Sequence, residues 1–230
     1  MALRALIFDV DGTLAETEEI HRLAFNRAFA EDGLPWHWDV ERYRDLLAVT
    51  GGRERIRHFV AMTPGVVDPG DDRIARLHQR KNALYGETVR AGACPLRPGV
   101  ADLVRAARAA GLRLAIATTT SRSNVEALLA ATFPDELPDL FDPIVCGEDV
   151  AAKKPHPEAY LQALARLGLP PAACLAFEDS KNGLAAARAA GLATIVTPGL
   201  YTAGERFDGA AAVLPDLTAF DLASHGRSTE

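Results

Sequence analysis

Two aspartates separated by one residue form the part of the sequence with the clearest chemical potential. Asp9 and Asp11 follow the apolar residues 6–8 and precede Gly12. This run has the length of a buried strand, and Asp and Gly favour its end, so we expect both carboxylates at the strand's carboxyl tip. Two carboxylates this close repel each other and need a cation or a shared proton. An Asp-Gly hairpin turn is the alternative, but the chain continues into a helical pattern rather than a second strand.

Three further polar clusters follow predicted elements later in the chain, and most of them fall where a strand ends. The clusters are residues 118–121, which include Thr118 and Thr119, then Lys153 with Lys154, and Glu178 with Asp179. Carboxyl ends of parallel strands meet at one edge of a sheet, so we expect these side chains to lie near the first two acids. Carboxylates without histidine or thiol suit a hard ion such as Mg²⁺, and a Lys and a Thr beside it suit a phosphoryl group. One acid can then attack phosphorus while its neighbour moves the proton.

Each cluster taken alone also has an ordinary structural explanation. Threonines are common in strands, and a lysine before a proline is common in a solvated loop. Glu178 and Asp179, followed by Ser180, can cap the next helix. The order of the clusters along the chain and their shared sheet edge favour the chemical interpretation.

The elements that must position these residues alternate between strand and helix from residue 96 onward. This alternation predicts an α/β class with a doubly wound parallel sheet and right-handed crossovers. The expected strands after the first cover residues 112–117, 143–146, 174–177, 194–196 and 211–214. Residues 17–90 instead show helical spacing of apolar side chains throughout, interrupted by glycine and proline. We therefore predict a core domain of residues 1–16 and 92–230, and an all-helical cap domain of residues 17–91.

Composition restricts the class of partner. The 230 residues carry a net charge of −6, which argues against a nucleic-acid backbone as partner, and no apolar run reaches membrane-spanning length. The N-terminus lacks a signal-peptide layout, and three widely spaced cysteines are typical of reduced thiols. We expect a cytoplasmic protein with a small-molecule partner. No exposed apolar stripe requires a second subunit, so we expect a monomer.

The ordered clusters resemble the four motifs of the haloacid-dehalogenase superfamily of phosphohydrolases. The matching segments are Asp9-Val-Asp11-Gly-Thr13, Thr118, Lys154-Pro-His-Pro-Glu-Ala-Tyr160 and Glu178-Asp179-Ser-Lys-Asn-Gly183. The resemblance spans nearly the whole chain, and the helical insert is similar to that superfamily's small cap. Within the superfamily the chain is similar to β-phosphoglucomutase. It resembles the CbbY-type sugar-bisphosphate phosphatases more closely, through residues 11–19, 117–121 and 198–202.

The resemblance implies roles for the core residues. Asp9 would form an aspartyl-phosphate, while Asp11 would protonate the leaving alcohol and then activate water. Thr118, with Thr119 beside it, and Lys154 would hold the phosphoryl oxygens. Lys154 is preferred over the lysine before it because it directly precedes the proline of the motif.

The resemblance also implies a magnesium site. Asp9, the backbone carbonyl of Asp11 and Asp179 would hold Mg²⁺, with Glu178 in support. Asn124 is a further candidate for contact with the phosphoryl group.

Cap residues are expected to recognise the rest of the substrate. By motif position Thr17, Glu18 and His21 lie at the cap entrance, and His21 is expected to be a hydrogen-bonded cap residue rather than a catalyst. Arg53 and Lys81 match basic residues that face substrate in the mutase, which makes them candidates for a distal phosphate. Residues 17–91 hold as many acidic as basic residues, so net charge gives no independent sign of a second phosphate.

Three functions are compatible with these motifs to different degrees. The resemblance implies a Mg²⁺-dependent phosphatase that converts xylulose 1,5-bisphosphate to xylulose 5-phosphate. The alternative is a phosphosugar mutase of the β-phosphoglucomutase type, in which sugar rather than water captures the aspartyl-phosphate. A phospho-accepting signalling module shares the chemistry, but it is shorter and lacks a cap.

Overall fold

The computed structural model describes residues 2–134 and 140–225, and within them six strands form one sheet. All neighbours pair in parallel, in the order β3-β2-β1-β4-β5-β6. The strands are β1 Ala5–Phe8, β2 Arg113–Ala117, β3 Ile144–Val145, β4 Cys174–Glu178, β5 Ala193–Val196 and β6 Ala212–Val213. The predicted α/β class, the parallel sheet and the edge position of the last strand are therefore confirmed.

Helices cover both faces of the sheet, because alternate residues of a strand point to opposite sides. Leu6 and Phe8 of β1 pack on the face that α5 and α6 cover, whereas Ala5 and Ile7 pack on the face of α7 and α8. These helices are α5 Val100–Ala109, α6 Arg122–Thr132, α7 Glu158–Leu167 and α8 Lys181–Ala189. Three short elements were not predicted, namely η1 Pro171–Ala173, η2 Leu217–Ala219 and α9 Leu222–His225.

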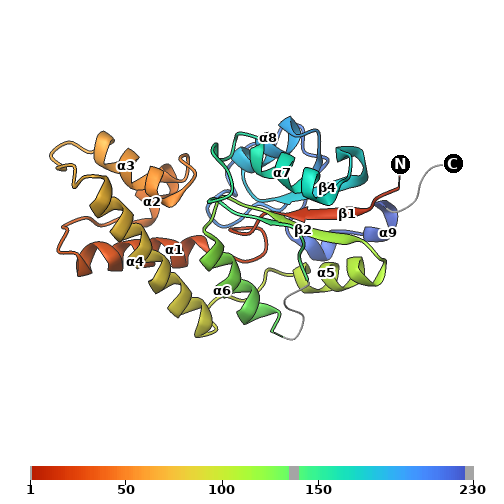
Figure 1. Ribbon diagram of the computed structural model, residues 1–230, viewed down its shortest axis with the longest axis horizontal. Helices are drawn as coiled ribbons and strands as arrows, with labels where there is room; N and C mark the ends of the chain where they lie inside the picture. The colour runs from red at the N-terminus through yellow and green to blue at the C-terminus, as the bar shows by residue number, and fades with distance from the viewer. Residues whose placement is uncertain (1, 135–139, 226–230) are drawn as a thin grey trace.

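Four further helices form a separate body between β1 and β2, as predicted (Figure 1). They are α1 Glu18–Glu31, α2 Val40–Leu46, α3 Gly52–Met62 and α4 Asp71–Arg90. This body has its own aromatic core, in which the Trp38 ring lies 4.7 Å from Phe25 and 4.9 Å from Phe29, between centroids. The helical insertion is confirmed, and its exact limits at residues 17 and 91 stay predictions.

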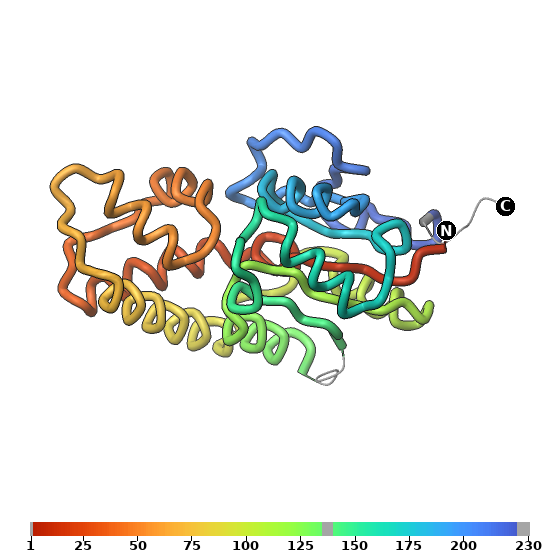
Figure 2. The backbone as a smooth tube through the Cα atoms, turned by 45° about the horizontal axis from the view of Figure 1, so that its top comes forward, coloured from red at the N-terminus to blue at the C-terminus, as the bar shows by residue number. Residues whose placement is uncertain are grey.

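The cap lies at the carboxyl end of the strands, while the start of β1 and helix α9 lie at the opposite end of the molecule (Figures 1 and 2). The two segments that join cap and core run side by side, because Ala15 makes bridges to both Asp11 and Leu96. Helix α4 also packs against α6 of the core. None of the helices in the described ranges has the length and apolar character needed to cross a membrane.

Candidate active site

The first acidic pair lies where the sequence predicts it, directly after β1. Asp9 and Asp11 lie on either side of Val10, and Gly12 then turns the chain with φ of 78°. A Cβ on Gly12 would lie 2.2 Å from Asp179 Oδ2, so glycine both permits the positive φ and leaves room for that carboxylate. The turn therefore brings the end of β1 against the end of β4.

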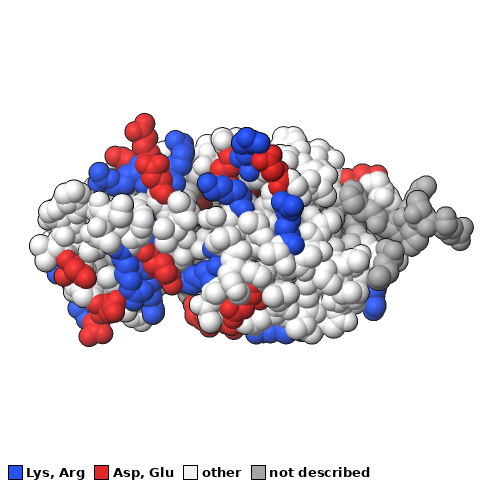
Figure 3. Space-filling view, turned by 90° about the horizontal axis from the view of Figure 1, so that it is seen from above, with Lys and Arg blue, Asp and Glu red and all other residues white. Residues whose placement is uncertain are grey.

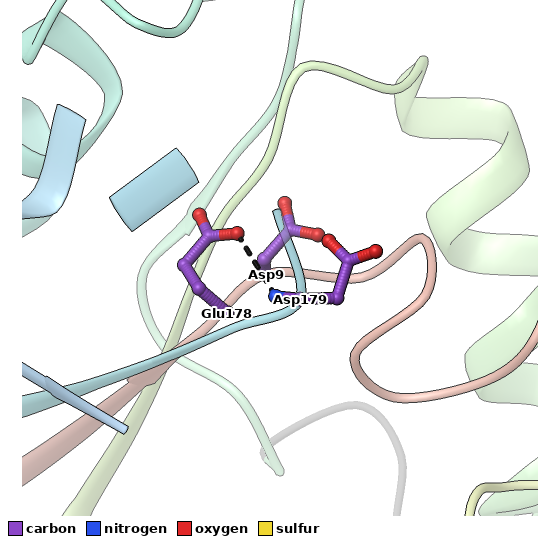
Figure 4. Close-up of side chains that lie close together, drawn as sticks. All are labelled: Asp9, Glu178 and Asp179. Carbon is purple, nitrogen blue, oxygen red and sulfur yellow. Dashed lines mark hydrogen bonds between the residues drawn. The ribbon is translucent and has the colours of Figure 1, made fainter. Parts of the chain in front are cut away.

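Three buried carboxylates meet at this edge of the sheet. Asp9, Glu178 and Asp179 each offer an oxygen, and these atoms lie within 4.8 Å of one another (Figure 4). Burial raises the pKa of Asp9 to about 8 and raises the pKa of Asp179 well above its usual value. Repulsion between the neighbouring carboxylates adds to both shifts. Such a set needs positive charge, and its oxygen donors fit a hard divalent cation.

Lys154 supplies one positive charge. Its Nζ donates to Asp9 Oδ1 at 2.6 Å and to Glu178 Oε1 at 2.7 Å, and its side chain is 4% exposed. Burial acts to lower the pKa of Lys154, but the two carboxylates outweigh it and hold the pKa above its ordinary value. The Tyr160 hydroxyl donates to the same Glu178 oxygen at 2.5 Å. Lys154 is thus held in place against Asp9.

Close packing also positions Glu178. A Cβ on Gly183 would lie 1.9 Å from Glu178 Oε2, so the first turn of α8 can approach only because it carries glycine there. Ser180 caps this helix by accepting a hydrogen bond from Gly183 N. The capping explanation for the segment is therefore correct for Ser180, whereas Glu178 and Asp179 point into the acidic cluster.

Asp11 belongs to a second hydrogen-bonded group that reaches into the cap. Thr17 Oγ1 donates to Asp11 Oδ1 at 2.5 Å, and His21 Nε2 lies 3.0 Å from the same oxygen. Lys81 Nζ lies 2.8 Å from His21 Nδ1, and the His21 ring stacks on Tyr85. Because Lys81 donates to Nδ1, the Nε2 proton of His21 is directed at Asp11.

The two carboxyl groups after β1 therefore have opposite electrostatics. Burial acts to raise the pKa of Asp11, but His21 and Thr17 outweigh it and hold the pKa well below the usual range. Burial lowers the pKa of Lys81 to about 7, against the attraction of Asp11. The pKa values of Asp9 and Asp11 are thus shifted in opposite directions, although only one residue separates them.

A cavity of about 350 Å³ lies between core and cap and contains these groups. Its core wall includes Thr118, which is buried, together with Thr119 and Asn124. Asn124 Nδ2 donates to Thr120 Oγ1 at 3.2 Å and to Asn82 Oδ1 at 3.3 Å, while Asn124 Oδ1 is buried without a partner. The cavity therefore brings together all the predicted core residues.

Four of the five predicted cap residues, Glu18, His21, Arg53 and Lys81, line this cavity. Thr17 is fully buried and does not line it, and it contacts Asp11 instead. Glu18 lines the cavity and accepts a hydrogen bond from the Tyr43 hydroxyl at 2.6 Å. Arg53 lines it, is exposed and has no ion pair or side-chain hydrogen bond to any residue the structure describes. Arg55 is buried and donates to Tyr43 and to the carbonyl oxygen of Leu46.

Sequence reasoning missed several residues of the site. Thr202 Oγ1 lies 3.3 Å from Asp179 Oδ2, and Lys153 pairs with Glu54 of the cap at 2.8 Å. Tyr160 was part of the matching motif that begins at Lys154, but no role was predicted for it. Thr202 lies in the segment 198–202 that carries the CbbY resemblance, and this was the available signal.

Charged side chains of both signs alternate over the cap and along its boundary with the core on the face seen in Figure 3. Many of the cap cations pair with cap acids, such as Arg73 with Asp32 at 2.6 Å and Arg57 with Asp71 at 2.8 Å. No large patch of one sign covers this face. Recognition of an anion by the cap must therefore depend on individual residues that face the cavity.

Comparison with known sequences gives one consistent family. A family model of haloacid dehalogenase-like hydrolases matches residues 3–191. Protein CbbY of Rhodobacter capsulatus is 57% identical over 220 residues, which cover 95% of this chain and 96% of that protein. The CBBY-like protein of Arabidopsis thaliana is 39% identical, over 96% of this chain and 73% of its own length.

Comparison with solved structures gives the same family as comparison with known sequences. CbbY from Rhodobacter sphaeroides in complex with phosphate superposes with a TM-score of 0.93 and 49% identity, covering 97% of this chain and 99% of that one. A variant of that protein in complex with xylulose-(1,5)bisphosphate gives a TM-score of 0.93 and 48% identity, covering 98% and 100%. A putative β-phosphoglucomutase from Thermotoga maritima gives a TM-score of 0.68 and 28% identity, covering 92% of this chain and 94% of that one.

Proposed function

Because this chain belongs to the haloacid dehalogenase-like hydrolases, we propose that it is a magnesium-dependent phosphatase acting on a small sugar bisphosphate. The observation that carries the proposal is the placement of Asp9 and Asp11 at the floor of a cavity closed by the cap. The relation to CbbY over nearly the whole chain supports a sugar phosphate as substrate.

Asp9 is the nucleophile in this proposal. Its Oδ1 is held by Lys154, while Oδ2 makes no hydrogen bond to a described residue and can attack phosphorus. The new bond joins Asp9 oxygen to phosphorus, and the bond from phosphorus to the sugar oxygen breaks. Lys154 and Thr118 stabilise the negative charge on the transferred group.

Asp11 moves the protons. Asp11 enters the first step protonated and gives that proton to the departing sugar oxygen. As the carboxylate, it then takes a proton from the water that attacks the aspartyl-phosphate, which restores the protonated acid. Breakage of the bond between phosphorus and Asp9 releases phosphate and restores the free carboxylate. In the arrangement described, Asp11 is ionised, as the second step requires, and His21 Nε2 is the proton-bearing group in contact with it.

Mg²⁺ fits the acidic cluster, because its donors are buried carboxylates, the pKa values of Asp9 and Asp179 are raised, and the family implies a divalent metal. Asp9, Asp179 and the carbonyl oxygen of Asp11 would hold the ion, and Glu178 would support it through Lys154. When bound, the ion neutralises charge on the phosphoryl oxygens and on the nucleophile.

Xylulose 1,5-bisphosphate is the substrate that we propose, with hydrolysis at C1 to xylulose 5-phosphate. A CbbY structure of 48% identity was solved in complex with this compound. In this chain the exposed, unpaired Arg53 faces the same cavity as Asp9, as a ligand of the distal phosphate requires. Lys81 is buried against His21, and we now propose that it acts through Asp11 rather than on the distal phosphate.

The test is phosphate release in the presence of Mg²⁺ from xylulose 1,5-bisphosphate, ribulose 1,5-bisphosphate, β-glucose 1-phosphate and glucose 6-phosphate, with Asp9→Asn as control. We expect a strong preference for the xylulose compound, abolished in the variant. Formation of glucose 6-phosphate from β-glucose 1-phosphate with little free phosphate would identify a mutase instead. Undiminished activity of Asp9→Asn would exclude the aspartyl-phosphate mechanism.

A further inference from the structure

A histidine that the proposed chemistry does not use lies on the cap side of the cavity. His78, on α4, lines the catalytic cavity and also an adjoining groove of about 650 Å³. Its side chain makes no hydrogen bond to any residue the structure describes. A hydrogen-bonding group that lines a substrate cavity without a protein partner is available to a ligand.

A pair of glycines makes room for this side chain. A Cβ on Gly52 would lie 2.5 Å from both Cδ2 and Nε2 of His78. A Cβ on Gly51 would lie 2.5 Å from Lys153 Nζ, which comes from the core. The two glycines at the start of α3 therefore allow a cap imidazole and a core ammonium to approach the same turn. The two glycines therefore do more than interrupt the helical pattern, which is all that the sequence indicated for them.

Basic side chains from four segments surround His78, and the acidic residue Glu148 also lines both cavities. Lys81 lies on the same helix, Arg53 on α3, His21 on α1, and Lys153 on the core loop. Glu54 faces this region, and it is paired with Lys153 at 2.8 Å. Burial, followed by these cations, lowers the pKa of His78 to about 3, so the imidazole is neutral at physiological pH.

A neutral hydrogen-bonding group among cations is suited to an anion rather than to a second cation or an apolar group. Arg53 lacks a protein partner, so it can pair with the same anion. The cavity is continuous from the Asp9 end to this end, because both line it. An anion at His78 can therefore belong to the molecule whose other end is at Asp9.

The geometry points to His78 as a specificity-determining residue that hydrogen-bonds, beside Arg53, to the second phosphate of a sugar bisphosphate. This inference rests on the proposed function, because it takes the phosphate that reacts to be the one at Asp9. It adds the prediction that recognition of the second phosphate depends on a neutral imidazole as well as on a guanidinium.

The experiment compares a substrate with two phosphates and one with a single phosphoryl group. kcat/KM is measured for xylulose 1,5-bisphosphate and for p-nitrophenyl phosphate in wild type, His78→Leu, His78→Gln and Gly52→Ala. Loss of a hydrogen bond to a charged group corresponds to roughly 10- to 100-fold in binding. For the bisphosphate, we expect His78→Leu to lower kcat/KM by this factor, through a higher KM. For p-nitrophenyl phosphate, its kcat/KM should stay within about twofold of wild type.

The other variants separate a role in recognition from a role in folding. His78→Gln keeps a neutral hydrogen-bonding group and should recover most of the loss. Gly52→Ala displaces the imidazole while alanine favours the helix, so it should reproduce the selective loss in a folded protein. His58→Gln, on the same helix as Gly52 but outside both cavities, is the matched control and should leave both substrates unaffected.

Each outcome decides between the two proposals. Equal losses on both substrates in His78→Leu, or an unchanged preference for the bisphosphate, would overturn the role of His78 and leave the proposed function standing. A wild-type enzyme that hydrolyses p-nitrophenyl phosphate but has no preference for the bisphosphate would overturn the proposed substrate and the role of His78 together.

Discussion

The core and cap walls of the cavity are built on different principles. In the core wall the ionisable groups are buried and in direct contact, as Lys154 is with Asp9 and Glu178. In the cap several charged side chains pair with one another at the surface, as Arg80 does with Glu31 at 2.6 Å. Only selected cap residues face the cavity, and they include the unpaired Arg53.

This difference corresponds to two functions. Buried carboxylates with raised pKa values work against folding, so their position at the end of the strands is explained by chemistry rather than by stability. Surface ion pairs each contribute about 0–1 kcal/mol, so the cap can change individual side chains without losing its fold. We infer that the core determines which reaction occurs and the cap determines which molecule undergoes it.

The largest expected effect comes from the centre of the core wall. Asp9→Asn removes the nucleophile while it keeps the shape of the side chain, so kcat should fall by about 10⁴-fold or more. The melting temperature should not fall, because Lys154 keeps Glu178 as a partner and one buried charge is removed. Phosphate release and thermal unfolding of the same preparation test both statements. Activity within tenfold of wild type would contradict the division between the walls.

The sequence was informative about the core for a physical reason. Acids, a hydroxyl and a lysine placed after predicted parallel strands must converge, because the strands share one edge. Arg53 and Arg55 show why the cap was harder. They lie on one helix about 200° apart and both line the cavity. Helical spacing alone cannot say that Arg55 is held by Tyr43 and Leu46 whereas Arg53 has no partner among the described residues. Thr202 approaches Asp179 through a loop whose path no local pattern specifies.

Removal of the metal is expected to inactivate the core and to change its pH dependence. Chelation should reduce activity by about 10³-fold or more, restored by Mg²⁺, since the ion supplies charge neutralisation. Mg²⁺ should raise the melting temperature of wild type, and Asp179→Asn should lose most of that increase. Titration calorimetry and thermal unfolding measure these effects. If Mg²⁺ raises the melting temperature of Asp179→Asn as much as that of wild type, the acidic cluster is excluded as the metal site.

The contribution of Asp9 to the stability of the chelated protein, measured as the difference between wild type and Asp9→Asn, should fall as pH rises between about 4 and about 8. The difference isolates Asp9 from His78, whose lowered pKa acts in the opposite direction. The pKa of Asp9 is about 8 in the folded protein and near 3.8 when unfolded, so the folded state binds more protons in this window. Bound Mg²⁺ should flatten the dependence. A difference between metal-free wild type and Asp9→Asn that rises over the same range would show that Asp9 is not held as described.

An intermediate effect is expected where the cap contacts the acid of the core. Lys81→Met keeps the packing against Phe25 and Tyr85 but removes the donor to His21, so kcat should fall by about 10- to 100-fold. Arg80→Met, on the exposed side of the same helix, is the control and should change kcat less than twofold. If both variants behave alike, the cap does not act through Asp11. Steady-state kinetics at several pH values would show this.

The two neighbouring arginines of α3 provide a finer comparison within the cap. Arg53→Gln should raise KM for the bisphosphate by roughly 10-fold without loss of stability, because Arg53 is exposed and unpaired. Arg55→Gln should lower the free energy of unfolding by about 1–3 kcal/mol, because its donors to Tyr43 and Leu46 are buried. Denaturant unfolding and kinetics on both variants test the assignment. The reverse result would exchange their roles.

The smallest effect is expected from the ion pair that joins the two walls. Lys153 and Glu54 are partly exposed, and such pairs contribute about 0–1 kcal/mol even at 2.8 Å. Lys153→Met, Glu54→Gln and the double variant should each keep kcat/KM within about threefold, with a coupling energy below about 1 kcal/mol. Lys154→Met, one residue further along, should instead lose activity by about 10³-fold, because it contacts Asp9 directly. A large coupling between Lys153 and Glu54 would mean that cap closure itself limits the rate, and then the two walls could not be assigned separate functions.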